Sequence, residues 1–279
     1  MPKKLIAVVG PTASGKTTTA IDIALKHNTE IISFDSRQFY QELNIGVARP
    51  EEVELSSLPH HFIATHSIHE SISAGQFSAI AWPIIQQLLE NQDTIVAVGG
   101  SGLFLKVLLD GIDPLPQDET VRAHFTSLHT EKGIEHLQDL LEVKDPEYFR
   151  QVDIYNPHRV IRALEVIELS GKKFSELRTH NKQQLPFTVE YHYIQPDKTI
   201  LHQRIDERVE KMMDMGLWEE AERLYPLRQL QPLNTVGYKE LFECMEGLHT
   251  LSEAIEWIKT HSKQYAKRQV TWFNKEVNR

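Results

Sequence analysis

An octapeptide near the start of the chain combines residue types that bind phosphate. It consists of Gly10, Pro11, Thr12, Ala13, Ser14, Gly15, Lys16 and Thr17, and it fits the pattern G-x-x-x-x-G-K-[ST]. Its glycines let backbone N–H groups turn toward an anion, and its lysine adds a positive charge. An apolar run over residues 5–9 predicts a strand before it, and residues 18–27 predict a helix after it. Since a helix N-terminus also favours an anion, the segment predicts a site for a di- or triphosphate.

Polar residues also follow two further predicted strands, residues 30–34 and 94–98. The first strand leads into Asp35 and the sequence DSRQFY, and the second leads into the glycine-rich sequence GGSG, which contains Ser101. In open α/β sheets, ligands bind beyond the carboxyl ends of the strands. We therefore expect Asp35 near the phosphate site, where a carboxylate can serve as a general base or hold a metal-bound water. On the residues alone, a turn-forming or helix-capping aspartate is an equal alternative.

Two arginines, Arg204 and Arg208, lie four residues apart on a predicted helix and share one face. One of them is expected to reach the phosphates as an anion clamp, and salt bridges with nearby acidic residues are a strong alternative. Histidines at positions 60, 61, 66 and 69 lack cysteine partners and a regular ligand spacing, so we assign them to a loop and not to a metal site.

The order of predicted elements indicates an α/β fold with a parallel sheet. Strands are predicted at residues 5–10, 30–34, 94–98 and 188–194, with helices between the first three. The stretch before the last strand is too long for a simple crossover and has helical patterns at residues 120–132, 133–143, 146–152 and 157–170. We therefore expect a P-loop, nucleotide-kinase-like core, residues 1–111 and 187–279, that carries a helical insertion over residues 112–186.

The composition is that of an ordinary globular protein, with 41% hydrophobic and 25% charged residues. A single cysteine, Cys244, rules out an intramolecular disulfide framework, and no apolar run reaches the roughly 18 residues that span a bilayer. Lys3 and Lys4 lead directly into a strand, so a signal peptide is not expected. We expect a cytoplasmic protein without a membrane partner.

The net charge of −9 is unevenly distributed along the chain. Residues 158–182 contain six lysines and arginines against three glutamates, and residues 259–279 contain six against one. Basic stretches on an acidic chain can form a local footprint for nucleic acid. On charge alone, two solvated helix faces are the favoured interpretation.

The ordered set of motifs resembles the tRNA dimethylallyltransferases, also called tRNA isopentenyltransferases, nearly end to end. The motifs are GPTASGKT at 10–17, DSRQFY at 35–40, GVARP at 46–50, GGSGL at 99–103, NPHRVIRALEV at 156–166, RIDERVEKMMDMG at 204–216, VGYKE at 236–240 and QYAKRQVTWF at 264–273. Ser101 replaces the usual threonine but keeps its hydroxyl, and Arg49 replaces the usual lysine. The last motif is not followed by the zinc finger of eukaryotic nuclear and cytosolic relatives, so we expect the bacterial type.

The resemblance implies transfer of a dimethylallyl group from dimethylallyl diphosphate to N6 of the adenine just 3′ of the anticodon. The phosphate loop would then hold the diphosphate of this donor, and no nucleoside triphosphate would be hydrolysed. Asp35 is implied as the base that takes the N6 proton. Lys16, Arg208 and a Mg²⁺ ion on the Thr17 hydroxyl are implied to stabilise the departing diphosphate.

The resemblance also implies contacts with the anticodon stem-loop of tRNA, whose target adenine must leave the base stack. The implied contact residues are Asp35, Ser36, Arg37, Gln38, Ser101, Ala123, Arg159, Val160, Ile161, Arg162 and Ala163. We expect a monomer that uses Mg²⁺ and binds tRNA and dimethylallyl diphosphate.

Three other functions share part of these features. A transferase that acts on free AMP or ATP would need no RNA-binding insertion, so the long helical insertion argues against it. A P-loop small-molecule kinase would bind ATP and transfer a phosphoryl group. A non-catalytic nucleotide switch would leave Asp35 without a role, and an Asp35→Asn substitution would then be silent.

Overall fold

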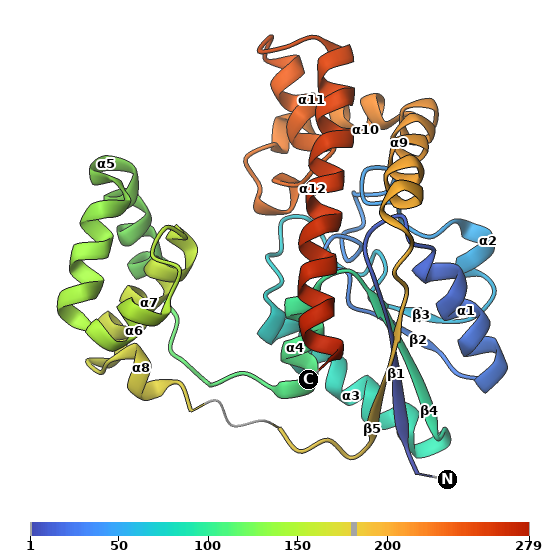
Figure 1. The fold of residues 1–279 in the computed structure, drawn as a ribbon, viewed down its shortest axis with the longest axis horizontal. Helices are drawn as coiled ribbons and strands as arrows, with labels where there is room; N and C mark the ends of the chain where they lie inside the picture. Colours follow the sequence, from blue (N-terminus) through green and yellow to red (C-terminus); the bar gives the residue numbers. More distant parts are fainter. Residues whose placement is uncertain (1, 180–182, 279) are drawn as a thin grey trace. The chain divides into compact units, whose positions relative to one another are not determined.

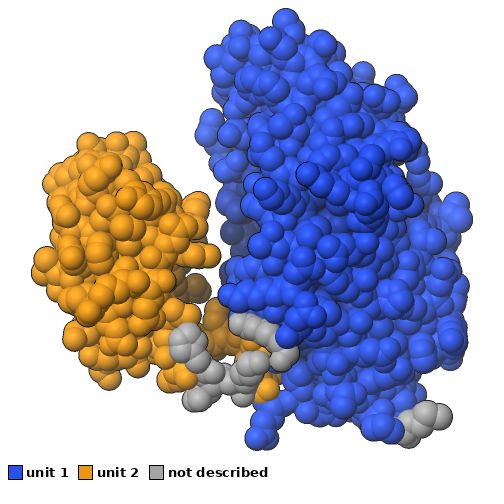
Figure 2. Space-filling view, in the orientation of Figure 1, with its two compact units in different colours: residues 1–109, 184–279 blue, residues 110–183 orange. Residues whose placement is uncertain are grey.

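The computed structural model describes residues 2–179 and 183–278, and the chain divides into two compact units. Unit 1 comprises residues 1–109 and 184–279, and unit 2 comprises residues 110–183 (Figure 1, Figure 2). The sequence prediction set the two boundaries a few residues later, at 112 and 186. Residues 180–182, which belong to the predicted insertion and to its basic stretch, lie outside the described residues.

Unit 1 is built on a five-stranded sheet in which each pair of neighbouring strands is parallel. The strands are β1 (Lys4–Val9), β2 (Ile31–Ser33), β3 (His60–His61), β4 (Thr94–Gly99) and β5 (Thr188–Tyr193), in the order β3-β2-β4-β1-β5. The predicted α/β class with a parallel sheet is confirmed. Strand β3 was not predicted, because a two-residue strand shows no periodicity.

Both faces of the sheet are covered by helices. Successive side chains of β1 point to opposite faces, so each face has its own set of contacts. Leu5 packs in one hydrophobic core with residues of α3 (Ala74–Asn91), whereas its neighbour Ile6 packs in another with residues of α1 (Lys16–His27). Both faces of β1 are therefore apolar, which explains its continuous β-branched and apolar sequence.

The remaining helices of unit 1 lie mostly after β5. They are α2 (Glu52–Leu55), α4 (Gly102–Asp110), α9 (Lys198–Asp214), α10 (Leu217–Leu224), α11 (Tyr238–Met245) and α12 (Leu251–Val277), with short 3₁₀ turns at Tyr225–Leu227 and Gln231–Leu233. Helix α12 begins at a capping box formed by Thr250 and Glu253. It contacts α9, α11 and β5, so the end of the chain packs along the core (Figure 1).

Unit 2 is helical and has a hydrophobic core of its own. It contains α5 (Glu119–Lys144), α6 (Pro146–Gln151), α7 (Pro157–Ser170) and α8 (Phe174–Leu177). Helix α5 is interrupted at Gly133, whose φ of 82° is not helical, which accounts for the two separate patterns in the sequence. Leu137 and Leu164 are fully buried between these helices.

Candidate active site

The phosphate loop joins β1 to α1, and two of its positions require glycine. A Cβ added at Gly10 would lie 2.4 Å from the Ile194 carbonyl oxygen, and Gly15 has a φ of 88° that other residues disfavour. Helix α1 begins at Lys16, directly after the loop, and no side chain of the described residues caps it. The first N–H groups of α1 can therefore bind an anion beside the Lys16 ammonium.

The Lys16 side chain lines the pocket that the phosphate loop encloses. Its Nζ donates a hydrogen bond to the Pro11 carbonyl oxygen over 2.7 Å. Burial lowers the pKa of Lys16 to about 8; the nearby Asp35 carboxylate opposes this shift, and the Arg208 guanidinium adds to it. A bound anion favours the charged ammonium, so anion binding and protonation of Lys16 are linked.

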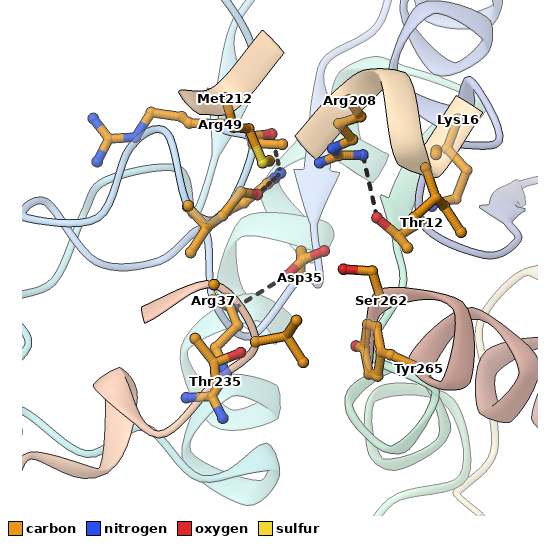
Figure 3. Close-up of a pocket in the computed structure, with 18 of the residues that line it drawn as sticks. Thr12, Lys16, Asp35, Arg37, Arg49, Arg208, Met212, Thr235, Ser262 and Tyr265 are labelled. Carbon is orange, nitrogen blue, oxygen red and sulfur yellow. Dashed lines mark hydrogen bonds between the residues drawn. The ribbon is translucent and has the colours of Figure 1, made fainter. Parts of the chain in front are cut away.

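Asp35 follows β2 and lies in the same pocket. Its Oδ1 accepts a hydrogen bond from the Arg37 backbone N–H over 3.1 Å. Figure 3 shows the Asp35 carboxylate facing the space into which Lys16 and Arg208 also point. A carboxylate is thus placed beside a cationic, phosphate-binding cluster, where it can accept a proton from a nucleophile.

Of the two candidate arginines on α9, Arg208 is the one that faces the pocket. Its Nη1 donates a hydrogen bond to Thr12 Oγ1 over 3.2 Å, and burial lowers its pKa (Figure 3). Arg204 is exposed. The carboxylates of Asp206 and Glu210, the alternative partners on this helix, pair with lysines of α12.

Ser101, just after β4, holds the segment that follows Asp35. Its Oγ accepts the Ser36 backbone N–H over 3.0 Å, and the two hydroxyl oxygens lie 3.0 Å apart. Burial together with the Asp35 charge raises the pKa of the Tyr265 phenol of α12 to about 12, and the nearby Ser101 hydroxyl acts in the opposite direction. Tyr265 is therefore neutral at physiological pH and keeps its hydroxyl proton for donation.

Arg37 and Gln38, predicted to contact RNA, make hydrogen bonds within the protein. Arg37 Nη1 donates to the Pro232 carbonyl oxygen over 3.0 Å, and Gln38 Nε2 donates to the Ala48 carbonyl oxygen over 2.9 Å. These bonds tie the segment after β2 to two loops that line the pocket. Both side chains shape the pocket wall in this structure, and their contact with RNA stays a prediction.

The pocket has a volume of about 820 Å³ and contains apolar as well as charged side chains. Its apolar residues on α9 and α12 are Ile205, Val209, Met212 and Ile258. A diphosphate with a short hydrocarbon tail carries both kinds of group. A pocket with both kinds of lining can hold a ligand that has a charged end and an apolar part.

Comparison with known proteins assigns the chain to a family. The family model described as IPP transferase matches residues 38–276. The chain is also 43% identical over 277 residues to the tRNA dimethylallyltransferase of Christiangramia forsetii. This alignment covers 99% of this chain and 92% of that relative. The chain belongs to the tRNA dimethylallyltransferase family. The family resemblance seen in the sequence motifs is thereby confirmed.

Solved structures of the family have the same fold over nearly the whole chain. The tRNA isopentenylpyrophosphate transferase of Bacillus halodurans is 35% identical and superposes with a TM-score of 0.69. The match covers 98% of this chain and 87% of that one. A eukaryotic dimethylallyltransferase acting on tRNA is 25% identical, with a TM-score of 0.80 over 97% of this chain and 70% of that one.

In this family member, the six residues of unit 2 predicted to contact tRNA differ in exposure. They are Ala123, Arg159, Val160, Ile161, Arg162 and Ala163. Ala123 and Arg159 are exposed, and Arg162 is half-buried. Val160, Ile161 and Ala163 belong to the hydrophobic core of unit 2, so their side chains pack α7 and do not face a ligand. Contact of these three residues with tRNA stays a prediction, and with buried side chains it would involve their backbone atoms.

Arg162 has a structural role within unit 2. Its Nη1 donates to the Pro116 carbonyl oxygen and to Glu165 Oε2, each over 2.9 Å. The Glu165 side chain is fully buried and also accepts hydrogen bonds from Arg122. Arg162 therefore neutralises a buried carboxylate. This ion pair limits the capacity of Arg162 to bind a phosphate of RNA.

Sequence reasoning missed two buried polar side chains that support the site, Gln269 and Glu220. Gln269 bonds to the phosphate loop, and Glu220 accepts the Gly46 backbone N–H and the Tyr238 hydroxyl. A signal for Gln269 existed, because it lies on the same helix face as the apolar Ala266 and Phe273. A polar residue on a buried face needs specific partners.

The described residues contain no group of three or more histidine, cysteine, aspartate or glutamate side chains that could hold a metal ion. Within the same residues, no helix combines the length and the apolar character needed to cross a bilayer. Two of the four histidines that the sequence assigned to a loop, His60 and His61, instead form strand β3, whose pairing with β2 is not visible in local sequence.

Proposed function

We propose that this protein transfers the dimethylallyl group of dimethylallyl diphosphate to N6 of the adenine 3′ of the anticodon in tRNA. The observation that carries the proposal is the convergence of Lys16, Arg208 and Asp35 on one pocket. Two cations at a phosphate loop suit a diphosphate leaving group, and an adjacent carboxylate suits an amine nucleophile. The family membership supports tRNA as the acceptor.

The reaction follows from these positions. N6 of the adenine attacks C1 of the allyl group, and a C–N bond forms as the C1–O bond breaks. The electron pair of the C1–O bond leaves with diphosphate, whose growing negative charge is stabilised by Lys16, Arg208 and the N–H groups at the start of α1. Asp35 takes the proton that N6 loses. The apolar residues of α9 and α12 keep water from the developing allylic cation.

The residues of the loop fit a Mg²⁺ ion, with the Thr17 hydroxyl as the protein ligand. Mg²⁺ usually keeps several waters and takes few protein ligands together with phosphate oxygens. Thr17 lines the same pocket as Lys16 and Arg208. When bound, Mg²⁺ would neutralise charge on the leaving diphosphate. Binding of dimethylallyl diphosphate should then tighten with Mg²⁺, and a Thr17→Ala variant should lose most of that gain.

A label-transfer experiment tests the proposed activity. The protein is incubated with unmodified tRNA, AMP, Mg²⁺ and either labelled dimethylallyl diphosphate or labelled ATP. We expect the label of the prenyl donor alone to reach the RNA. Labelling of AMP in place of tRNA would support the free-adenylate transferase, and phosphoryl transfer from ATP would support the kinase. Either result would overturn the proposal.

A further inference from the structure

The Gln269 side chain of α12 joins the phosphate loop to the loop after β4. It is 5% exposed. Its Oε1 accepts the Thr12 backbone N–H over 2.8 Å, and its Nε2 donates to the Gly100 carbonyl oxygen over 3.0 Å. These two loops come from neighbouring strands, β1 and β4, and serve different parts of the proposed reaction.

On the diphosphate side, Gln269 fixes the residue that holds Arg208. The Thr12 backbone is bonded to Gln269, and the Thr12 hydroxyl accepts the hydrogen bond from Arg208. A shift of Thr12 therefore changes where the guanidinium points. Transition-state stabilisation depends on such placement, because donors must be aligned before the charge develops.

On the acceptor side, Gln269 fixes the segment beside Asp35. Gly100 precedes Ser101, which holds the backbone N–H of Ser36. The contact with Gly100 is close, because a Cβ added at Gly100 would lie 2.2 Å from Gln269 Nε2. The position of the amide thus constrains the backbone that leads through Ser101 and Ser36 to Asp35.

The helix holds Gln269 rigidly in this place. Ala266, one turn before, and Phe273, one turn after, are almost completely buried on the same face of α12. A buried amide loses hydration and is tolerated when both of its polar atoms are bonded, as they are here. The residue therefore has little freedom to move independently of the two loops.

We propose that Gln269 is a positioning residue that couples occupancy of the diphosphate site to binding of the acceptor at Asp35. This inference rests on the proposed function. Diphosphate bound by Lys16 and the loop favours one position of Thr12. Gln269 transmits that position to Gly100 and, through Ser101, to the Ser36–Asp35 segment. Coupling between two sites requires a physical link of this kind, and it acts equally in both directions.

Binding measurements test the coupling. The dissociation constant of an anticodon stem-loop RNA is measured with and without saturating inorganic pyrophosphate, for wild type and for Gln269→Met. We expect the wild-type ratio of the two constants to differ from one by about fivefold or more, the usual lower range of allosteric coupling. In Gln269→Met, which keeps the length but loses the bonds, the ratio should fall close to one while both ligands still bind.

Two further variants separate coupling from a general loss of structure. Phe273→Leu alters the same buried face of α12 but leaves both hydrogen bonds of Gln269 in place; it should lower the melting temperature and keep the wild-type ratio. Gln269→Glu keeps the shape of the side chain, but an ionised carboxylate at pH 8 repels the Gly100 carbonyl oxygen in place of donating to it. The variant should lose the coupling. The proposal is overturned if the wild-type ratio is one, or if Gln269→Met or Gln269→Glu keeps the wild-type ratio.

Transfer kinetics provide a second readout. With both substrates saturating, Gln269→Met should lower kcat, because misplaced Arg208 and Asp35 act in the chemical step, whereas Phe273→Leu should not. An unchanged kcat for Gln269→Met would contradict the positioning role. If wild type transfers no label at all, the proposed function fails, and the binding ratios still decide the coupling separately.

Discussion

The proposed reaction assigns the role of general base to the Asp35 carboxylate. An Asp35→Asn substitution keeps the size of the side chain and an oxygen for the Arg37 N–H, but removes the base. We expect the single-turnover rate to fall by about 10²–10⁴, the usual contribution of a general base. Binding of tRNA and of dimethylallyl diphosphate should be retained. Rapid-quench measurement with both substrates saturating checks this, and a rate close to that of wild type would remove Asp35 from the role.

The lowered pKa of Lys16 predicts a pH dependence of diphosphate binding. Below about pH 8 the ammonium is charged in the free protein and attracts the ligand. Above that pH the free protein loses the proton, which the bound diphosphate restores. Affinity should therefore fall by up to about tenfold per pH unit above pH 8, with uptake of a proton on binding. Calorimetry in buffers of different ionisation enthalpy measures both quantities.

Lys16→Arg is the matched control for this pH effect, because arginine keeps its charge across the whole range. The ionisation of the ligand itself is common to both proteins, so the difference between their pH profiles isolates Lys16. A wild-type profile that runs parallel to that of Lys16→Arg would contradict the prediction.

The two arginines of α9 form a natural matched pair. Arg208→Ala removes the donor that faces the pocket, and we expect it to cost about 2–4 kcal/mol of transition-state stabilisation, as loss of one preorganised donor does. Arg204→Ala removes an equal charge from an exposed position of the same helix and should leave kcat/KM unchanged. If Lys16 and Arg208 act on the same diphosphate, as proposed, Lys16→Ala and Arg208→Ala should be non-additive when combined. Equal effects of Arg208→Ala and Arg204→Ala would argue against the assignment.

Among the elements, the turn at residues 44–46 depends on a carboxylate of a distant helix. Glu220 on α10 is 2% exposed and accepts the Ile45 and Gly46 N–H groups, each over 3.0 Å, and the Tyr238 hydroxyl over 2.6 Å. Tyr238→Phe leaves this buried charge with one donor fewer. We expect the free energy of unfolding to fall by about 1.5–3 kcal/mol, the range for hydrogen bonds to charged groups.

Chemical denaturation checks the Tyr238 prediction, with Tyr155→Phe as the control. Tyr155 is 77% exposed in unit 2, so removal of its hydroxyl should change stability little. A Tyr238→Phe protein as stable as the Tyr155→Phe protein would show that the Glu220 carboxylate is satisfied by its backbone donors alone.

Elements with strong local patterns were predicted well, and contacts between distant elements were not. The strand before the phosphate loop and the helices of unit 2 follow from periodicity and from caps such as Asn156. The Gln269–Thr12 bond joins residues 257 positions apart, and the Glu220–Gly46 bond joins residues 174 apart. Local sequence contains no information on which loop a distant helix will reach, so these partners required the structure.

For the molecule as a whole, the distribution of cations matters more than the net charge of −9. In unit 2, Arg122 and Arg162 both pair with the buried Glu165, so their charges are partly used inside the protein. Arg159, on the same helix as Arg162, is exposed. The sequence motifs predict the same role for Arg159 and Arg162, but their surroundings differ. Arg162 stabilises unit 2 through Glu165, whereas the exposed Arg159 can reach a phosphate.

A salt series with tRNA tests this separation. If Arg159 contacts a phosphate, Arg159→Ala should flatten the slope of log affinity against log salt by about 0.7–0.9, the value for one lost contact. Arg162→Ala should chiefly lower the stability of unit 2, because it leaves Glu165 with less compensation. Lys26→Ala, which removes one exposed charge from the end of α1, controls for net charge and should not alter the slope. An Arg159→Ala slope equal to that of Lys26→Ala would make Arg159 a solvated surface residue.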